Sequence, residues 1–434
     1  MTARQTIAQL RRYESRNVMF CEPDGSWPIV WKRTQGVHVW DANGKKYLDL
    51  TAAFGVAAAG HANPNVVKAG QKQMAKLLHA MGDVHPHALK AELARELSRL
   101  TFERWTKTQN PKRQTPKPIT GKVIFSNSGF EAVEAALKTA VLATGKCGVI
   151  AFAGAYHGLG YGALNATHRK FFRDPFRSQL REFGHFVPFP VEDEVTRLKL
   201  KNKNETPHVV SCKEIESRIR RIFRREKIGA ILVEPIQARG GINIPPPEFL
   251  PLLRKLCDEH GALLILDEIY TGFGRTGKWF ACEHSGTGVS PVSSPKTETH
   301  GQDVHAATIP DLICLGKALT GGFPLSACVG RAGLMDAAWP ASTGEAIHTS
   351  TFLGHPVGCA MALAQIKEIQ RLKLCERSAK LGKFLLGELS SIQHPKFKTR
   401  FAVRGLGLMA GIELTLPNGK PAVEPALNAV KTLL

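Results

Sequence analysis

The sequence predicts an α/β fold whose central layer is a mostly parallel β-sheet. Two observations lead to this prediction. Short runs of consecutive apolar residues alternate with segments in which apolar residues recur at helical spacing. The apolar runs show no polar side that would face water, which is typical of parallel strands covered by helices on both faces.

The first 60 residues contain three short β-prone runs, at 29–31, 37–40 and 47–50. The turn sequence Asp41-Ala42-Asn43-Gly44 separates the last two runs, which predicts that they form a hairpin. A helical pattern follows at 89–100. The regular alternation then begins, with strands expected at 123–125, 149–152, 228–233, 262–266 and 312–315, and helices at 132–143 and 248–260.

Two stretches interrupt this alternation and are interpreted as insertions. Residues 104–118 are basic and rich in proline, and residues 286–308 have low complexity without apolar periodicity. Both are expected to be surface loops. The chain stops at 430–434 in a helical pattern without a capping signal, so we expect the C-terminal domain to be truncated.

The charge balance is strongly basic, with 58 Lys and Arg against 37 Asp and Glu in 434 residues. The excess is concentrated at 104–122, 197–203 and 218–227, where only Trp105 and Phe223 could stack on bases. No groove-reading motif accompanies these runs, so we interpret them as solvated surface and predict no nucleic-acid partner.

Other compositional features bear on location. No apolar run reaches eighteen residues, which predicts that no segment spans a membrane. The nine cysteines show neither a CxxC pair nor metal-ligand spacing, so we expect no metal site. Such dispersed cysteines are typical of reduced thiols in a cytoplasmic protein.

Three polar residues stand at the ends of predicted strands: Glu234, Asp267 and Lys317. Ligands of α/β sheets bind at the carboxyl ends of the strands. A carboxylate there can hold a cationic ring nitrogen, and a lysine can form an imine with an aldehyde. These are two of the parts that a pyridoxal phosphate site requires.

Two further parts of a pyridoxal phosphate site follow other predicted strands. Residues 126–129 connect a strand to a helix, and the free amides of a helix N-terminus bind phosphate well. Tyr156 follows another strand and offers a ring that can stack on a pyridine. Each feature alone has a common structural explanation, such as a helix cap, a solvated lysine, a simple turn or a core tyrosine. Their joint order favours the cofactor site.

The segments LLILDEIYTGFGRTG (263–277) and PDLICLGKALTGG (310–322) resemble the signature of the class III aminotransferases. This pyridoxal-phosphate family includes the ornithine, acetylornithine and 4-aminobutyrate aminotransferases. SNSGFEAVEAALK, YHG, VEPIQ, HTSTFLGHP and VRGLGLMAG follow the family's order, and the resemblance extends from about residue 29 to the C-terminus.

The resemblance implies a fold-type I pyridoxal-phosphate transferase with two domains. Residues 61–333 would form the large domain that binds the cofactor, with 286–308 as an insertion. Residues 334–434 would form a smaller α+β domain, to which residues 1–60 contribute an N-terminal arm and strands. The expected reaction moves an amino group from an amino acid or ω-amino acid to a 2-oxo acid.

The family motifs also imply roles for individual residues. Lys317 resembles the lysine that forms the internal aldimine and then moves the substrate proton. Asp267 resembles the partner of the pyridinium nitrogen. The other implied cofactor contacts are Glu234 beside the cofactor, Ser128, Gly129 and the Phe130 backbone at the phosphate, Tyr156 on the ring, and Thr351 reaching the phosphate from a neighbouring subunit. Thr351 thus implies a homodimer with shared active sites.

Three positions depart from the family pattern and affect substrate recognition. Tyr270 replaces a frequent glutamine near the cofactor's phenolic oxygen, and Leu159 replaces an arginine. Arg404 matches the arginine that binds a substrate carboxylate, but Arg239 stands where many members have a glutamate that pairs with it. We therefore expect Arg239 and Arg404 to bind carboxylates together, with no glutamate to neutralise Arg404. The alternative is that Arg239 points to solvent or pairs elsewhere.

Two other functions remain compatible with the residues. The same cofactor and fold also serve aminomutases, decarboxylases and racemases. A degenerate, non-catalytic paralogue that binds anions through its positive charge is a third interpretation. The presence of both Lys317 and Asp267 argues against the non-catalytic interpretation.

Overall fold

The computed structural model describes residues 1–22, 27–109, 119–191, 211–285, 308–392 and 400–433. Its central layer is a seven-stranded sheet in the order β4-β10-β9-β8-β7-β5-β6. In this sheet β10 pairs antiparallel with both neighbours, and the other pairs are parallel. The strands are β4 (Gly121–Ser126), β5 (Gly148–Phe152), β6 (Gly184–Val187), β7 (Ile228–Val233), β8 (Leu263–Asp267), β9 (Leu312–Leu315) and β10 (Ser326–Arg331). The predicted mostly parallel sheet is confirmed.

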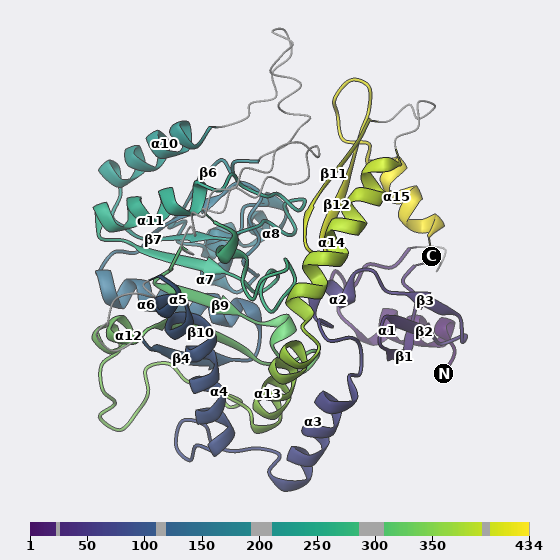
Figure 1. Cartoon of the computed structure of the whole chain (residues 1–434), viewed down its shortest axis with the longest axis horizontal. Helices are drawn as coiled ribbons and strands as arrows, with labels where there is room; N and C mark the ends of the chain where they lie inside the picture. Colours follow the sequence, from purple (N-terminus) through teal and green to yellow (C-terminus); the bar gives the residue numbers. More distant parts are fainter. Residues whose placement is uncertain (23–26, 110–118, 192–210, 286–307, 393–399, 434) are drawn as a thin grey trace.

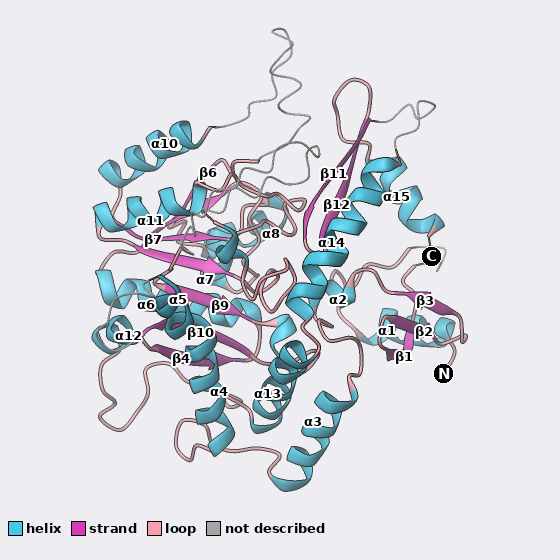
Figure 2. Cartoon of the chain, viewed as in Figure 1, coloured by secondary structure: helices cyan, strands magenta, loops and turns pink. Residues whose placement is uncertain are grey.

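Both faces of this sheet are buried under helices, as the continuous apolar runs predicted (Figure 2). Successive side chains of one strand belong to the two cores on opposite faces of the sheet. In β7, Ile231 and Val233 belong to the core on the side of α11 (Phe249–His260), whereas Ala230 and Leu232 belong to the core on the side of α6 (Gly129–Thr144). Because strand side chains alternate between the two faces, an all-apolar strand is what two covered faces require.

The helices lie close to the predicted positions where a prediction was made. The predicted patterns at 89–100, 132–143 and 248–260 correspond to α4, α6 and α11. The helices are α1 (Ala3–Tyr13), α2 (Ala52–Gly55), α3 (Pro64–Lys76), α4 (Ala88–Ser98), α5 (Arg104–Gln109), α6 (Gly129–Thr144), α7 (Tyr161–Ala166), α8 (Lys170–Arg173), α10 (Cys212–Arg225), α11 (Phe249–His260), α12 (Ala332–Ala338), α13 (Pro356–Arg371), α14 (Leu374–Ser391) and α15 (Val423–Thr432). A π-helical turn at Arg99–Glu103 continues α4, and 3₁₀ turns lie at Asp174–Gln179, Ala281–His284 and Lys317–Leu319.

The N-terminal strands form a separate three-stranded antiparallel sheet of β1 (Trp31–Gln35), β2 (His38–Asp41) and β3 (Lys46–Leu48). The predicted hairpin between β2 and β3 is confirmed. The Oδ1 atom of Asp41 accepts hydrogen bonds from the amides of Asn43 and Lys45, which closes the turn. The first strand begins at Trp31 rather than at residue 29, because pairing with β2 starts opposite Asp41.

A third sheet, of β11 (Arg400–Leu406) and β12 (Met409–Thr415), is a two-stranded antiparallel ribbon that contacts α14. Figure 1 shows this ribbon apart from the N-terminal sheet, with the two chain termini on the same side of the molecule. An ion pair between Lys431 of α15 and Glu22, with Nζ and Oε1 2.6 Å apart, joins the two terminal segments.

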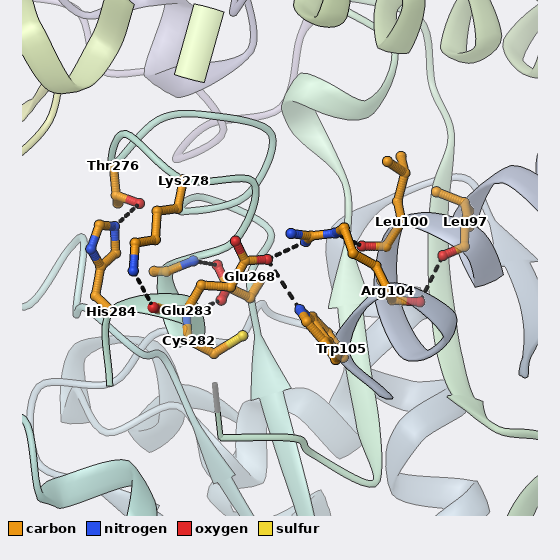
Figure 3. A network of polar contacts seen from close by, with 12 residues as sticks. Leu97, Leu100, Arg104, Trp105, Glu268, Thr276, Lys278, Cys282, Glu283 and His284 are labelled. Atoms are coloured by element: carbon orange, nitrogen blue, oxygen red, sulfur yellow. Dashed lines mark hydrogen bonds and ion pairs between the residues drawn. The ribbon is translucent and has the colours of Figure 1, made fainter. Parts of the chain in front are cut away.

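The prediction of a surface loop at 104–118 was wrong for its first part. Residues 104–109 form α5, and the Trp105 side chain is only 1% exposed. The Trp105 indole nitrogen donates to Oε1 of Glu283 at 3.1 Å, and Arg104 pairs with the same carboxylate. Figure 3 shows the polar network that ties these two side chains to the segment following β8. The basic, proline-rich composition of this stretch gave no indication that the Trp105 side chain is buried. Residues 110–118 lie outside the described residues.

The second predicted insertion, 286–308, falls outside the described residues except for Thr308. Thr308 is buried, and its hydroxyl lies 2.9 Å from that of Ser285, so it belongs to the folded part. The basic run 197–203 is also outside the described residues. In the run 218–227, Arg218 pairs with Glu214 and Arg220 pairs with Glu216 and Glu259. Within the described chain, no helix is long and apolar enough to cross a bilayer.

Candidate active site

A cavity of about 810 Å³ opens at the carboxyl ends of the parallel strands. Most of the site residues predicted from the sequence line this cavity, although they come from separate segments of the chain. The predicted site residues that line it are Gly129, Phe130, Tyr156, Glu234, Arg239, Asp267, Tyr270 and Lys317. They follow β4, β5, β7, β8 and β9, whose carboxyl ends meet at one edge of the sheet.

Lys317 follows β9 and Gly316 and lies half-buried in the cavity. Its backbone has φ of +43°, a left-handed conformation that a residue with a side chain rarely adopts. The Nζ atom lies 4.7 Å from the centre of the Tyr270 ring. Burial lowers the pKa of Lys317, although Asp267 and Glu234 oppose this effect through their charges. A larger fraction of this amine is therefore neutral, and thus nucleophilic, than of an exposed lysine.

Asp267 ends β8 and is buried in a fixed orientation. Its Oδ2 atom lies 2.8 Å from Nδ1 of His157, and its Oδ1 atom accepts from the Ile269 amide at 3.1 Å. His157 is also buried, and its Nε2 atom has no hydrogen-bond partner among the described residues. Sequence reasoning missed His157, since it used only the tyrosine of the YHG motif. A histidine beside that tyrosine was the only local signal.

Glu234 follows β7 and holds the two loops that frame the cavity. Its carboxylate accepts from the amides of Tyr156 and Ala238, each at 3.0 Å. Burial raises the pKa of Glu234 to about 7, and the nearby Asp267 charge adds to the rise, while His157 opposes it. The carboxylate thus connects the loop after β5 with the loop that carries Arg239.

The N-terminus of α6 faces the cavity through Gly129 and Phe130. Ser128 is the N-cap, and its amide and hydroxyl both donate to Oε2 of Glu131, at 2.7 and 2.8 Å. Among the described residues, this capping box leaves the amides of Gly129 and Phe130 as the unpaired donors at the start of the helix. Two adjacent amides at a helix N-terminus form an anion-binding site.

The Phe130 ring packs against the loop that follows β5. Gly158 adopts φ of +112°, and a Cβ atom there would lie 2.3 Å from Cβ of Phe130. The glycine is therefore required by both its conformation and the close approach. Phe54 and Leu159 complete the apolar lining. Phe54 comes from the N-terminal segment, and nothing in the sequence indicated that it reaches the cavity.

The guanidinium of Arg239 lies over two aromatic rings at the cavity wall. Its Cζ atom is 4.4 Å from the centre of the Tyr156 ring and 5.4 Å from that of Phe172. Among the described residues no carboxylate forms an ion pair with it. Pairing of Arg239 with another acid is not observed among the described residues, but Arg239 is exposed, which agrees with the alternative that it points to solvent.

The expectation that Arg404 lacks a neutralising glutamate was wrong. Glu413 of β12 forms an ion pair with Nη1 of Arg404 on β11. The Nε atom of Arg404 also donates to the Gly241 carbonyl at 2.7 Å. The two strands bring these residues together because Arg404 pairs with Gly411, two residues from Glu413. Cross-strand neighbours of this kind cannot be read from a single sequence motif.

Thr351 is exposed and does not line the cavity of its own chain. It lies in the segment between α12 and α13. A role at a neighbouring subunit's cofactor, as the resemblance implies, stays a prediction.

Comparison with known proteins decides the family. Residues 20–431 match the model of the class-III aminotransferases. The chain belongs to this family. It is 36% identical over 398 residues to an acetylornithine aminotransferase from Methanosarcina mazei, an alignment that covers 91% of this chain and 82% of the relative. It is 34% identical to the 5-aminovalerate aminotransferase DavT from Pseudomonas aeruginosa, over 94% of this chain and 83% of that protein.

A solved structure extends this result to the fold and the cofactor. An ω-transaminase from Pseudomonas jessenii in complex with PMP superposes with a TM-score of 0.75 at 25% identity, covering 95% of this chain and 85% of that one. The predicted family, fold class, transamination and pyridoxal-phosphate dependence of this class-III aminotransferase are thereby confirmed.

The residues of the cavity fit pyridoxal phosphate. They include an amine, a fixed buried carboxylate, an aromatic ring and two free amides at a helix N-terminus. The unpaired Nε2 atom of buried His157 lies in the same wall. Gly129 leaves room beside Ile269, where a Cβ atom would come within 3.0 Å of the Ile269 side chain. These features suit a planar, phosphorylated, cationic ring.

Proposed function

We propose that this aminotransferase acts on amino acids or ω-amino acids with a 2-oxo acid as acceptor, and that Lys317 and Asp267 are its catalytic residues. The observation that supports this proposal is their placement in one cavity with Tyr156 and the N-terminus of α6. The acylated and ω-amino acid substrates named for its relatives belong to the same chemical class.

When bound, pyridoxal phosphate supplies an aldehyde and a ring that accepts electrons from the substrate. The Nζ atom of Lys317 would hold the cofactor through that aldehyde. In its neutral form the same atom would take the proton from the substrate carbon that carries the amine. The lowered pKa of Lys317 favours both roles, because each requires the neutral amine.

Asp267 is proposed to bind the protonated ring nitrogen through its carboxylate, and His157 to hold that carboxylate in place. Glu234 fixes the loops on both sides. Tyr156 would stack on the ring, and Tyr270 would bond the phenolic oxygen. The amides of Gly129 and Phe130 would bind the phosphate, with Ser128 as the cap that orients them.

We further propose that the protein is a homodimer in which Thr351 of one subunit reaches the phosphate of the other. Large apolar side chains are exposed in the segments near the cavity and near Thr351. They include Phe54, Leu159, Ile347 and Phe352. A second copy of the chain would cover them, and an equilibrium mass measurement by light scattering tests this directly.

We also propose that the domains divide at residues 60 and 333 and that the protein is located in the cytoplasm. The separate N-terminal and C-terminal sheets support the division. All nine cysteines are free thiols, which supports a reducing compartment.

The decisive experiment is a donor screen with 2-oxoglutarate and pyruvate as acceptors, read by amino-acid analysis. The proposal predicts formation of glutamate or alanine from at least one amino-acid donor, with the donor converted to its oxo form. Release of carbon dioxide, or migration of the amino group without an acceptor, would instead identify a decarboxylase or an aminomutase.

A further inference from the structure

The segment 349–355, which carries Thr351, lies against the segment that joins α3 to α4. Two histidines hold it there, His87 at the start of α4 and His355 at the start of α13. We propose that both are positioning residues that hold Thr351 only while their rings are neutral, so that mild acid releases the segment and weakens cofactor binding. This inference rests on the proposed role of Thr351 at the phosphate of a neighbouring subunit.

The two segments approach each other through their backbones. A Cβ atom at Gly82 would lie 2.2 Å from the Leu353 carbonyl oxygen. A Cβ atom at Gly354, whose φ is +65°, would lie 3.0 Å from the Lys90 side chain. Helix α13 packs against α3 and α4, so the segment leads into α13 beside the start of α4 (Figure 1). Bonds between these two backbones therefore fix where Thr351 lies.

His87 joins the two segments through both of its ring nitrogens. Its Nε2 atom lies 2.7 Å from the Gly354 carbonyl oxygen, and its Nδ1 atom accepts from the Lys90 amide at 3.3 Å as the N-cap of α4. A carbonyl oxygen can only accept, so Nε2 carries the hydrogen and Nδ1 presents a lone pair. Protonation of Nδ1 would place an N–H against the Lys90 N–H and remove the cap.

His355 caps α13 in the same way. Its Nδ1 atom accepts from the Val357 amide at 3.3 Å. Its ring centre lies 5.3 Å from that of Phe323 and 6.0 Å from that of Phe352. The centre of the His79 ring is 6.1 Å away. Protonation of His355 would thus remove the cap and put a positive charge at the positive end of a helix, beside a second imidazole.

The surroundings of His355 oppose its protonation. Burial lowers the pKa of His355 from its ordinary value of 6.5, and the nearby His79 and His87 lower it further. The folded state therefore favours the neutral ring. Its contribution to stability is complete at a pH above that ordinary value and is lost as the pH falls below it.

Other titratable side chains around the segment keep their state in mild acid. The Thr349 hydroxyl donates to Oδ2 of Asp83 at 2.7 Å, and this bond lowers the pKa of the Asp83 carboxyl. Burial raises the pKa of the Cys359 thiol to about 12. The Lys90 amine donates to the Gly82 carbonyl at 2.6 Å. Histidines are the side chains whose ordinary pKa lies in the mildly acidic range, so we assign the release to them.

The test replaces both histidines by asparagine, which caps helices well and does not titrate. Cofactor retained by the holoenzyme is measured by ultrafiltration and absorbance at about pH 7.5 and about pH 5.5. On acidification, the apparent dissociation constant should rise at least about fivefold more in wild type than in the double variant His87→Asn/His355→Asn. The cofactor's own titration is the same in both proteins and cancels. His85→Asn changes an exposed histidine of the same segment and should keep the wild-type rise.

Hydrogen exchange in the cofactor-free protein tests the two caps themselves. At about pH 5.5 the Lys90 and Val357 amides, relative to their intrinsic rates, should exchange at least about fivefold faster in wild type than in the double variant. Equal exchange in the two proteins, or an equal rise in the dissociation constant, would overturn the inference, as would loss of the rise in His85→Asn. A wild type that binds no cofactor at either pH would contradict the proposed function, and the exchange rates would still decide whether the histidines release the segment.

Discussion

The Nδ1 atom of His157 lies 2.8 Å from Oδ2 of Asp267, and both side chains are buried. The contact fixes the carboxylate that we assign to the cofactor's ring nitrogen. We therefore expect His157 to act through Asp267. When two side chains act as one unit, changing either of them removes the contribution of both to the rate.

We predict that Asp267→Asn lowers the rate constant of transamination by about a hundredfold or more, because a neutral amide cannot stabilise a cationic ring nitrogen. His157→Asn should lower it by about tenfold, since the carboxylate remains but is no longer held. Stopped-flow absorbance of the half-reaction measures both. The double variant should be no slower than Asp267→Asn alone. Losses that multiply would mean that His157 has an independent role.

Lys317→Ala should lower the rate of transamination at least about a thousandfold, because it deletes both the nucleophile and the base. The imine absorbance of the bound cofactor should vanish with it. Lys420→Ala, at an exposed position, serves as the control and should retain both signals. Normal turnover in Lys317→Ala would refute the assignment of this lysine.

The contribution of Glu234 to the stability of the cofactor-free protein should fall as the pH rises from about 5 to 8. Burial raises the pKa of Glu234 to about 7 from an ordinary value of 4.5, so the folded chain retains a proton that the unfolded chain releases. This contribution is complete below about pH 4.5 and is lost as the pH passes through about 7.

Urea unfolding at pH 5 and pH 8 measures this pH dependence. Glu234→Gln should reduce the difference between the two free energies of unfolding by up to about 3 kcal/mol. Glu14→Gln removes an exposed carboxylate and should leave the difference unchanged. Glu268 has a similarly raised pKa of about 7 through burial, so a residual slope is expected in Glu234→Gln. Equal slopes in wild type and Glu234→Gln would contradict the prediction.

Trp105→Ala should destabilise the protein by about 3–5 kcal/mol, because it removes a fully buried indole and leaves a cavity. Trp31→Ala offers a matched comparison, since Trp31 is 46% exposed, and should cost on the order of 1 kcal/mol or less. Chemical denaturation gives both values. Equal losses would show that α5 is only loosely attached to the fold.

Residues 286–307 should be replaceable by a short Gly-Ser linker of about four residues with little loss of activity. The hydroxyls of Ser285 and Thr308 are hydrogen-bonded, so the two ends of the segment already meet in the folded chain. Cofactor absorbance and the rate constant of the shortened variant are the measurements. Failure to bind cofactor would show that the segment takes part in the site.

The sequence by itself determined the sheet, the family and most of the cavity. The apolar runs that became β7, β8 and β9 identify buried strands, and the polar residues at their ends, Glu234, Asp267 and Lys317, do meet. These inferences succeeded because the parallel α/β arrangement brings the carboxyl ends of its strands to one edge, whatever the intervening loops contain.

Only the tertiary structure decided what each charged side chain pairs with. Glu413 beside Arg404, His157 beside Asp267, and the rings beneath Arg239 come from segments that no local pattern connects. The burial of Trp105 in a basic stretch is of the same kind. Local periodicity encodes which face of an element is buried. The partner of a polar group depends instead on the register and packing of elements distant in the chain, because hydrogen bonds and ion pairs form only within a few ångströms.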